Sequence, residues 1–213
     1  ELFLLNAGVS ILIMIVLLGL WPVVWVLSKI PCCKKPFGKL LAEYKFNTFT
    51  RYWIQCYLDL SIAGFIQLVS VPNVEVVWVF NYTSACLVVG LLAPTSSALF
   101  VLIRRNTEKI TSEEERFLQR WGTLLYEFEC TENLEAPFFY CAFTLNRLIF
   151  AASVAILGTY PYVQAIVDLI CMLGLLVFMV AVKPYLTKAA LRISILTEIV
   201  VSLVFLLVIY FLQ

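Results

Sequence analysis

The sequence contains no histidine in its 213 residues. Without an imidazole, this chain can hold no histidine-bearing zinc site, no haem with an axial histidine and no Ser-His-Asp triad. The cysteines show no paired ligand spacing, and there is no glycine-rich phosphate loop. The seven cysteines are Cys32, Cys33, Cys56, Cys86, Cys130, Cys141 and Cys171. We therefore expect no catalytic residues, no metal site, no cofactor beyond lipid, and no hydrolytic or redox enzyme.

Charge is also scarce. Charged residues make up 14% of the sequence and hydrophobic residues 62%, and the mean hydropathy is +0.96. A soluble domain of this length could not bury so many apolar side chains in one core. The composition predicts an integral membrane protein, with lipid as its first partner. The net charge of +1 comes without a basic tail, so we expect no nucleic-acid partner.

Apolar runs of about 20 residues, long enough to cross a bilayer as a helix, occur six times. They cover residues 2–29, 52–71, 78–103, 137–158, 162–182 and 193–212. None of them alternates strictly between apolar and polar residues, as a half-buried strand would. The predicted fold class is all-α, a polytopic membrane bundle of six transmembrane helices.

Positive charge is confined almost entirely to three loops. Fourteen of the fifteen Lys and Arg residues lie there, and these loops alternate with two that contain none. The three sets are Lys29, Lys34, Lys35, Lys39, Lys45 and Arg51; Arg104, Arg105, Lys109, Arg116 and Arg120; and Lys183, Lys188 and Arg192. The positive-inside rule makes these loops cytosolic and puts both chain ends on the outer or lumenal side.

This pattern divides the chain into segments. Residues 1–30 are predicted to form the first transmembrane helix, and residues 31–51 a cytosolic amphipathic connector. Residues 52–192 hold four further helices with a cytosolic loop at 104–136, and residues 193–213 form the sixth helix.

Two short features suggest covalent modification. Cys32 and Cys33 lie beside the predicted membrane on its cytosolic side, where they are either palmitoylated or ordinary thiols. The Asn81 sequon, "NYT", faces outward in the predicted topology and is a candidate for glycosylation, although it lies close to the membrane.

Arg147 is the one basic residue outside the three loops, and it lies within the run "AFTLNRLIFAAS". A charge at this depth costs several kcal/mol unless it is paired or hydrated, so it should face the bundle interior and a carboxylate. The candidate partners are Asp59, Asp168 and Glu198, with Asn146 beside the arginine. Two interpretations stay open: a cation or proton site, and a structural ion pair that fixes helix packing.

Several stretches resemble one protein family in their order along the chain. They are "FNTFTRYWIQCYLDLSIAG", "RWGTLLYEFE", "NRLIFAASVAILGTYPYVQ", "KPYL" and "TEI", and the resemblance covers roughly residues 39–213. This order resembles the transmembrane region of TRP-like proteins of ciliates and related protists, relatives of the polycystin and fungal flavin-carrier groups. The resemblance implies a cysteine-rich ectodomain before the first helix, a sensor-like four-helix bundle, and a sixth helix that begins a pore.

The resemblance also implies a candidate cation channel of the plasma or ciliary membrane, with homo- or hetero-oligomer partners. The sequence ends at Gln213, where a pore loop and second pore helix would follow, so we expect either a fragment or a protein without that pore. The alternative function is a non-conducting anchor or structural subunit that holds an extracellular or ciliary assembly. A scramblase or transporter is a third hypothesis.

Overall fold

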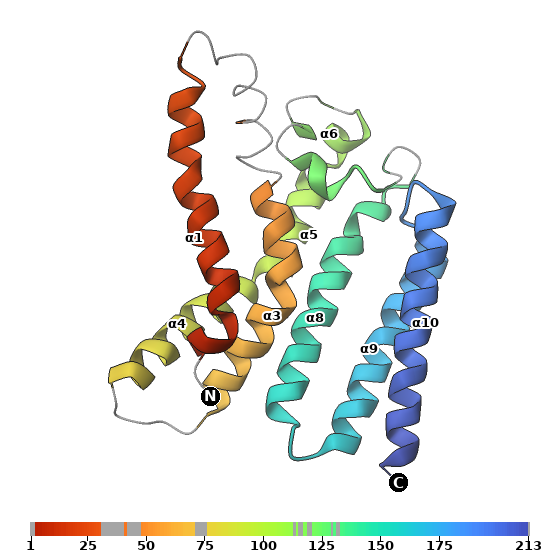
Figure 1. Ribbon diagram of the computed structural model, residues 1–213. Coiled ribbons are helices and arrows are strands. Elements are labelled where there is room, and N and C mark those ends of the chain that lie inside the picture. The colour runs from red at the N-terminus through yellow and green to blue at the C-terminus, as the bar shows by residue number, and fades with distance from the viewer. Residues whose placement is uncertain are drawn as a thin grey trace.

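The computed structural model describes residues 3–30, 41, 48–70, 76–112, 114, 117–118, 121–128, 130 and 133–212. These residues form helices and turns, with one isolated β-bridge between Phe128 and Tyr185 (Figure 1). Cys32 and Cys33, and most of the predicted connector at 31–51, lie outside the described residues.

The long helices account for most of the described chain. They are α1 (Phe3–Leu27), α3 (Phe49–Val69), α4 (Val76–Leu92), α5 (Thr95–Arg105), α8 (Phe139–Ile156), α9 (Pro161–Val182) and α10 (Lys188–Phe211). Between α5 and α8 lie the short helices α6 (Thr107–Thr111), η2 (Gly122–Leu124) and η3 (Ala136–Phe138). Within the described residues, five helical segments are long and apolar enough to cross a membrane. The chain is therefore a helical bundle with the character of an integral membrane protein.

The helix α3, which corresponds to the second predicted span, is not among those five segments. Its polar side chains lower its mean hydropathy. Two of them, Ser61 and Gln67, are fully buried against neighbouring helices. It packs against α1, α4 and α8, which makes it the centre of the bundle. A Cβ added at Gly64 would lie 2.5 Å from a methyl group of Val89, so glycine lets α3 and α4 approach closely.

The third predicted span, 78–103, lies within Val76–Arg105, one of the five segments that could cross a membrane, but its helix is interrupted at Ala93 and Pro94 into α4 and α5. Proline has no backbone N–H and cannot continue the helical ladder. The Tyr57 hydroxyl donates to the carbonyl of Leu92 over 2.9 Å, so α3 satisfies an acceptor at the break. In Figure 1, α4 runs obliquely to the other long helices and α5 turns toward the end where α3 begins.

Aromatic rings hold together the end of the bundle where α3, α8 and α10 begin. Phe128, Phe139, Tyr140 and Tyr185 form mutual ring contacts with centroid distances of 5.1–5.9 Å. Lys183 ends α9 in the left-handed conformation at φ 49°, and α10 begins at Lys188. The predicted sixth helix therefore starts five residues earlier than residue 193.

Both ends of the chain lie at the opposite end of the bundle, where α9 begins (Figure 1). Which side faces the cytosol stays a prediction of the charge pattern.

Candidate intramembrane site

Arg147 lies eight residues after the start of α8, while Asp59 and Glu198 each lie ten residues after the start of α3 and α10. At 1.5 Å per residue these positions are about 12 and 15 Å along their helices. The three helices begin at the same end of the bundle (Figure 1). The three residues therefore lie at similar distances along their helices from that end of the bundle.

The carboxylates whose charges act on Arg147 are Asp59 and Glu198. The guanidinium group also lies over the ring of Phe143, one turn earlier on α8, at 4.0 Å from the centroid. A cation over an aromatic face is stabilised by the ring quadrupole, more so away from water. We call Arg147, Asp59 and Glu198 the charge cluster. Its members belong to α8, α3 and α10.

Asp168, the other predicted partner, lies apart from the charge cluster. It is completely buried, and it accepts a hydrogen bond of 2.5 Å from the Ser153 hydroxyl. Asn146 faces the same neighbouring helix, because its amide donates to the Met172 sulfur over 3.5 Å. The expected single network is therefore divided: Asp168 and Asn146 lie between α8 and α9.

Four buried polar atoms have no hydrogen-bond partner in the described structure. They are Asn146 Oδ1, Asp168 Oδ2, Glu198 Oε2 and Ser202 Oγ. Glu198 and Ser202 are four residues apart on α10, so they lie on the same face of that helix. A buried polar atom without a partner costs free energy, so each of these atoms marks a place where a further group or proton would be stabilised.

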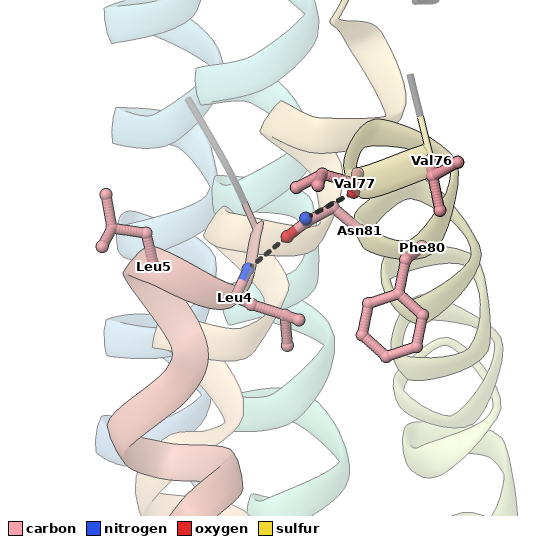
Figure 2. Close-up of a pocket in the computed structure, with 6 residues that line it drawn as sticks. All are labelled: Leu4, Leu5, Val76, Val77, Phe80 and Asn81. Atoms are coloured by element: carbon pink, nitrogen blue, oxygen red, sulfur yellow. Dashed lines mark hydrogen bonds between the residues drawn. The ribbon is translucent and has the colours of Figure 1, made fainter. Parts of the chain in front are cut away.

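Two amide side chains hold the beginning of α1, and sequence reasoning did not assign them this role. Gln67 Oε1 accepts from the backbone N–H of Phe3 at 2.9 Å, and Asn81 Oδ1 accepts from that of Leu4 at 2.8 Å. The first amides of a helix lack intrahelical acceptors, so α3 and α4 together cap α1. Figure 2 shows the Asn81 amide between the two helices, beside an apolar pocket of about 520 Å³.

The same contacts bear on the predicted glycosylation of Asn81. Its side chain is 2% exposed, and its amide nitrogen, the atom that a glycan would modify, donates to the Val77 carbonyl at 2.7 Å. Modification would require the side chain to leave both partners and open the α1–α4 contact. In this fold Asn81 acts as a helix cap, and the sequon pattern alone could not reveal its burial.

The end of the bundle that is predicted to be cytosolic carries a second, polar cavity of about 190 Å³. It is lined by Arg51, Ile54, Gln55, Glu127 and Tyr140. Nearby, burial raises the pKa of Tyr185, and the charges of Glu127 and Glu198 raise it further. A hydrogen bond with Ser194 lowers the same pKa. Glu198 therefore acts electrostatically on the turn between α9 and α10 as well as on Arg147.

Comparison of the chain with protein family models, with curated proteins and with solved structures finds no match. Within the described residues, no group of three or more Cys, Asp or Glu side chains is placed to hold a metal ion. The class of protein consequently rests on the apolar helices and on the polar groups between them.

Proposed function

We propose that this chain is the sensor-like membrane bundle, with its adjoining helix α10, of a TRP-like cation channel-type protein. The observation that carries the proposal is Arg147 within the apolar helix α8, on which the charges of Asp59 on α3 and Glu198 on α10 act. Ionisable residues within membrane helices are costly, and they are a functional-site hypothesis by default. The resemblance of the sequence to TRP-like proteins supports the same class.

The surface of α10 fits the role of an output helix. Ser202 is its one buried residue, and apolar side chains along the rest of the helix are exposed. In a channel-type protein these side chains would face lipid or the helices of a pore. Because Glu198 lies in the charge cluster, a change in the cluster would act directly on the position of α10.

The alternative function is a non-conducting anchor or structural subunit, with oligomer partners in the plasma or ciliary membrane. The aromatic contacts of Tyr185 with Phe128 and Phe139 favour it, because they hold the turn before α10 against the beginning of α8. In that case the charge cluster would serve packing alone.

The test is current recording from the natural full-length protein in planar bilayers. We expect cation currents in the wild type, a changed voltage or pH dependence in Glu198→Gln, and no change in the control Glu108→Gln. Glu108 is exposed on α6, so the control makes the same chemical change outside the bundle. Absence of current at both signs of voltage from folded, oligomeric protein would contradict the channel and favour the anchor.

A further inference from the structure

We propose that the polar cavity where α3 and α8 begin binds a small group that carries both a phosphate and an ammonium, as the headgroup of phosphatidylethanolamine does. We call it the interfacial cavity. It has a volume of about 190 Å³ and is lined by Arg51, Ile54, Gln55, Glu127 and Tyr140. The inference concerns a lipid site, and it holds whether the chain conducts ions or serves as an anchor.

Three segments that are far apart in the sequence form the walls of the interfacial cavity. Arg51 and Gln55 are four residues apart near the beginning of α3, so they lie on one face of that helix. Tyr140 is the second residue of α8. Glu127 lies in the turn before α8, and its backbone carbonyl accepts from the N–H of Leu186 at 2.9 Å. This hydrogen bond fixes the Glu127 turn against the segment between α9 and α10.

The lining carries one charge of each sign, and the two charges do not pair with each other. Within the described residues no ion pair joins Arg51 to Glu127, and both side chains are exposed. The charges of both act on the Tyr140 hydroxyl, so both lie within electrostatic range of one phenol. An unpaired guanidinium and an unpaired carboxylate at one cavity are complementary to a ligand with an anionic and a cationic group. A simple anion would be repelled by Glu127, and a simple cation by Arg51.

The hydrogen-bonding groups favour phosphate as the anionic part. Arg51 supplies donors only, Gln55 supplies an amide NH₂, and Tyr140 supplies a hydroxyl. In the part of the chain that the structure describes, neither the Gln55 amide nor the Tyr140 hydroxyl makes a hydrogen bond. A guanidinium binds phosphate oxygens through two parallel hydrogen bonds. A primary ammonium offers three donors, which the Glu127 carboxylate can accept.

The position and size of the interfacial cavity fit a lipid headgroup. Tyr140 is four residues inside Ala136–Ile156, one of the segments that could cross a membrane, so it lies about 6 Å from the beginning of that span. Tyrosine is enriched at this level, where its ring meets lipid and its hydroxyl meets headgroups and water. The cavity has the volume of about six water molecules at about 30 Å³ each, which leaves room for a small headgroup but not for acyl chains.

Native mass spectrometry of the full-length protein in detergent tests the proposal. The protein would be titrated with phosphatidylethanolamine, phosphatidylcholine and phosphatidylglycerol that carry the same short acyl chains. We expect phosphatidylethanolamine to bind about tenfold more tightly than the other two, because only its headgroup gives Glu127 a charge-assisted hydrogen bond. Equal binding of the three lipids, or no lipid bound to folded protein, would overturn the proposal.

Two variants separate the phosphate contact from the ammonium contact. Arg51→Gln should weaken the binding of all three lipids about tenfold, since each loses a charge-assisted hydrogen bond to its phosphate. Glu127→Gln should weaken phosphatidylethanolamine and strengthen phosphatidylglycerol until the two bind alike. The controls Arg105→Gln on α5 and Glu108→Gln on α6 make the same changes at exposed positions outside the cavity, and should leave binding unchanged. A lipid preference that survives in Glu127→Gln would overturn the ammonium contact.

Free phosphoethanolamine distinguishes the lipid from a soluble ligand with the same two charged groups. Displacement of phosphatidylethanolamine only at much higher concentrations of the free compound would support the lipid, because acyl chains add apolar contact with the helices. Displacement at equal concentrations would assign the interfacial cavity to a soluble zwitterion and overturn the lipid.

Discussion

At the scale of single residues, Asn81 connects two helices through one amide group. Its oxygen accepts from α1 and its nitrogen donates within α4. In Asn81→Ala the buried N–H of Leu4 loses its acceptor, which we expect to cost about 1–3 kcal/mol of unfolding free energy. Thermal unfolding of the detergent-solubilised protein would measure the loss.

The control is Thr83→Ala, which destroys the same sequon and removes only an exposed hydrogen bond to the Val79 carbonyl. We expect the stability of this variant to stay within about 0.5 kcal/mol of the wild type. If Asn81 carried a glycan, both variants would migrate faster on gels than the wild type, and that result would contradict the capping role.

Arg147 is the second residue whose role can be tested directly. In Arg147→Leu, the cation that lies over the Phe143 ring and interacts with the charges of Asp59 and Glu198 is lost, and we expect a destabilisation of about 1 kcal/mol. Arg147→Lys keeps the charge and should lose less. The control on the same helix is Leu145→Ala, since Leu145 is 48% exposed. Wild-type stability in Arg147→Leu would rule out a structural contribution.

The sequence was sufficient to identify Arg147 and its candidate acids, because a charge within an apolar run is conspicuous. It could not choose between Glu198 and Asp168. That choice depends on how α9 and α10 are rotated about their axes, which is fixed by packing contacts far apart in the chain. The burial of Asn81 depends in the same way on α1, which is more than seventy residues earlier.

At the scale of helices, the break between α4 and α5 depends on a side chain from α3. The buried Tyr57 hydroxyl donates to the carbonyl of Leu92, just before Pro94. Tyr57→Phe leaves this carbonyl without its partner, and we expect a destabilisation of about 1–3 kcal/mol. The control is Tyr82→Phe, because Tyr82 contacts Trp78 through its ring, which phenylalanine retains. Equal effects of the two variants would contradict a specific role for the Tyr57 hydroxyl.

The length of the apolar runs predicted where helices occur. It did not predict where a helix is interrupted. Pro94 was visible in the sequence, but proline also occurs within α1 at Pro22, where the helix continues. The difference is tertiary: α3 supplies a hydrogen-bond donor at Leu92, and Ser96 pairs with Thr144 of α8 at 2.7 Å. These contacts hold α4 and α5 at an angle to each other.

At the scale of the whole molecule, the alternation of charged and uncharged loops predicts which side of the membrane each turn faces. We expect Thr159→Cys, at the α8–α9 turn, to react with a membrane-impermeant maleimide on intact cells. Lys109→Cys, on α6, should react only after permeabilisation. Both would be made in a cysteine-free background of the full-length protein. The reverse pattern would contradict the predicted orientation, and labelling of both from one side would contradict the topology.

The capping of α1 by Gln67 and Asn81 has a consequence for the order of synthesis. The ribosome synthesises α1 before α3 and α4. The acceptors for the first backbone amides of α1 lie on those two later helices. The helix α1 is thus completed by helices made after it, and its final position forms only once α4 has been inserted. In a nascent chain that stops before Asn81, the backbone N–H of Leu4 would lack the acceptor that Asn81 provides.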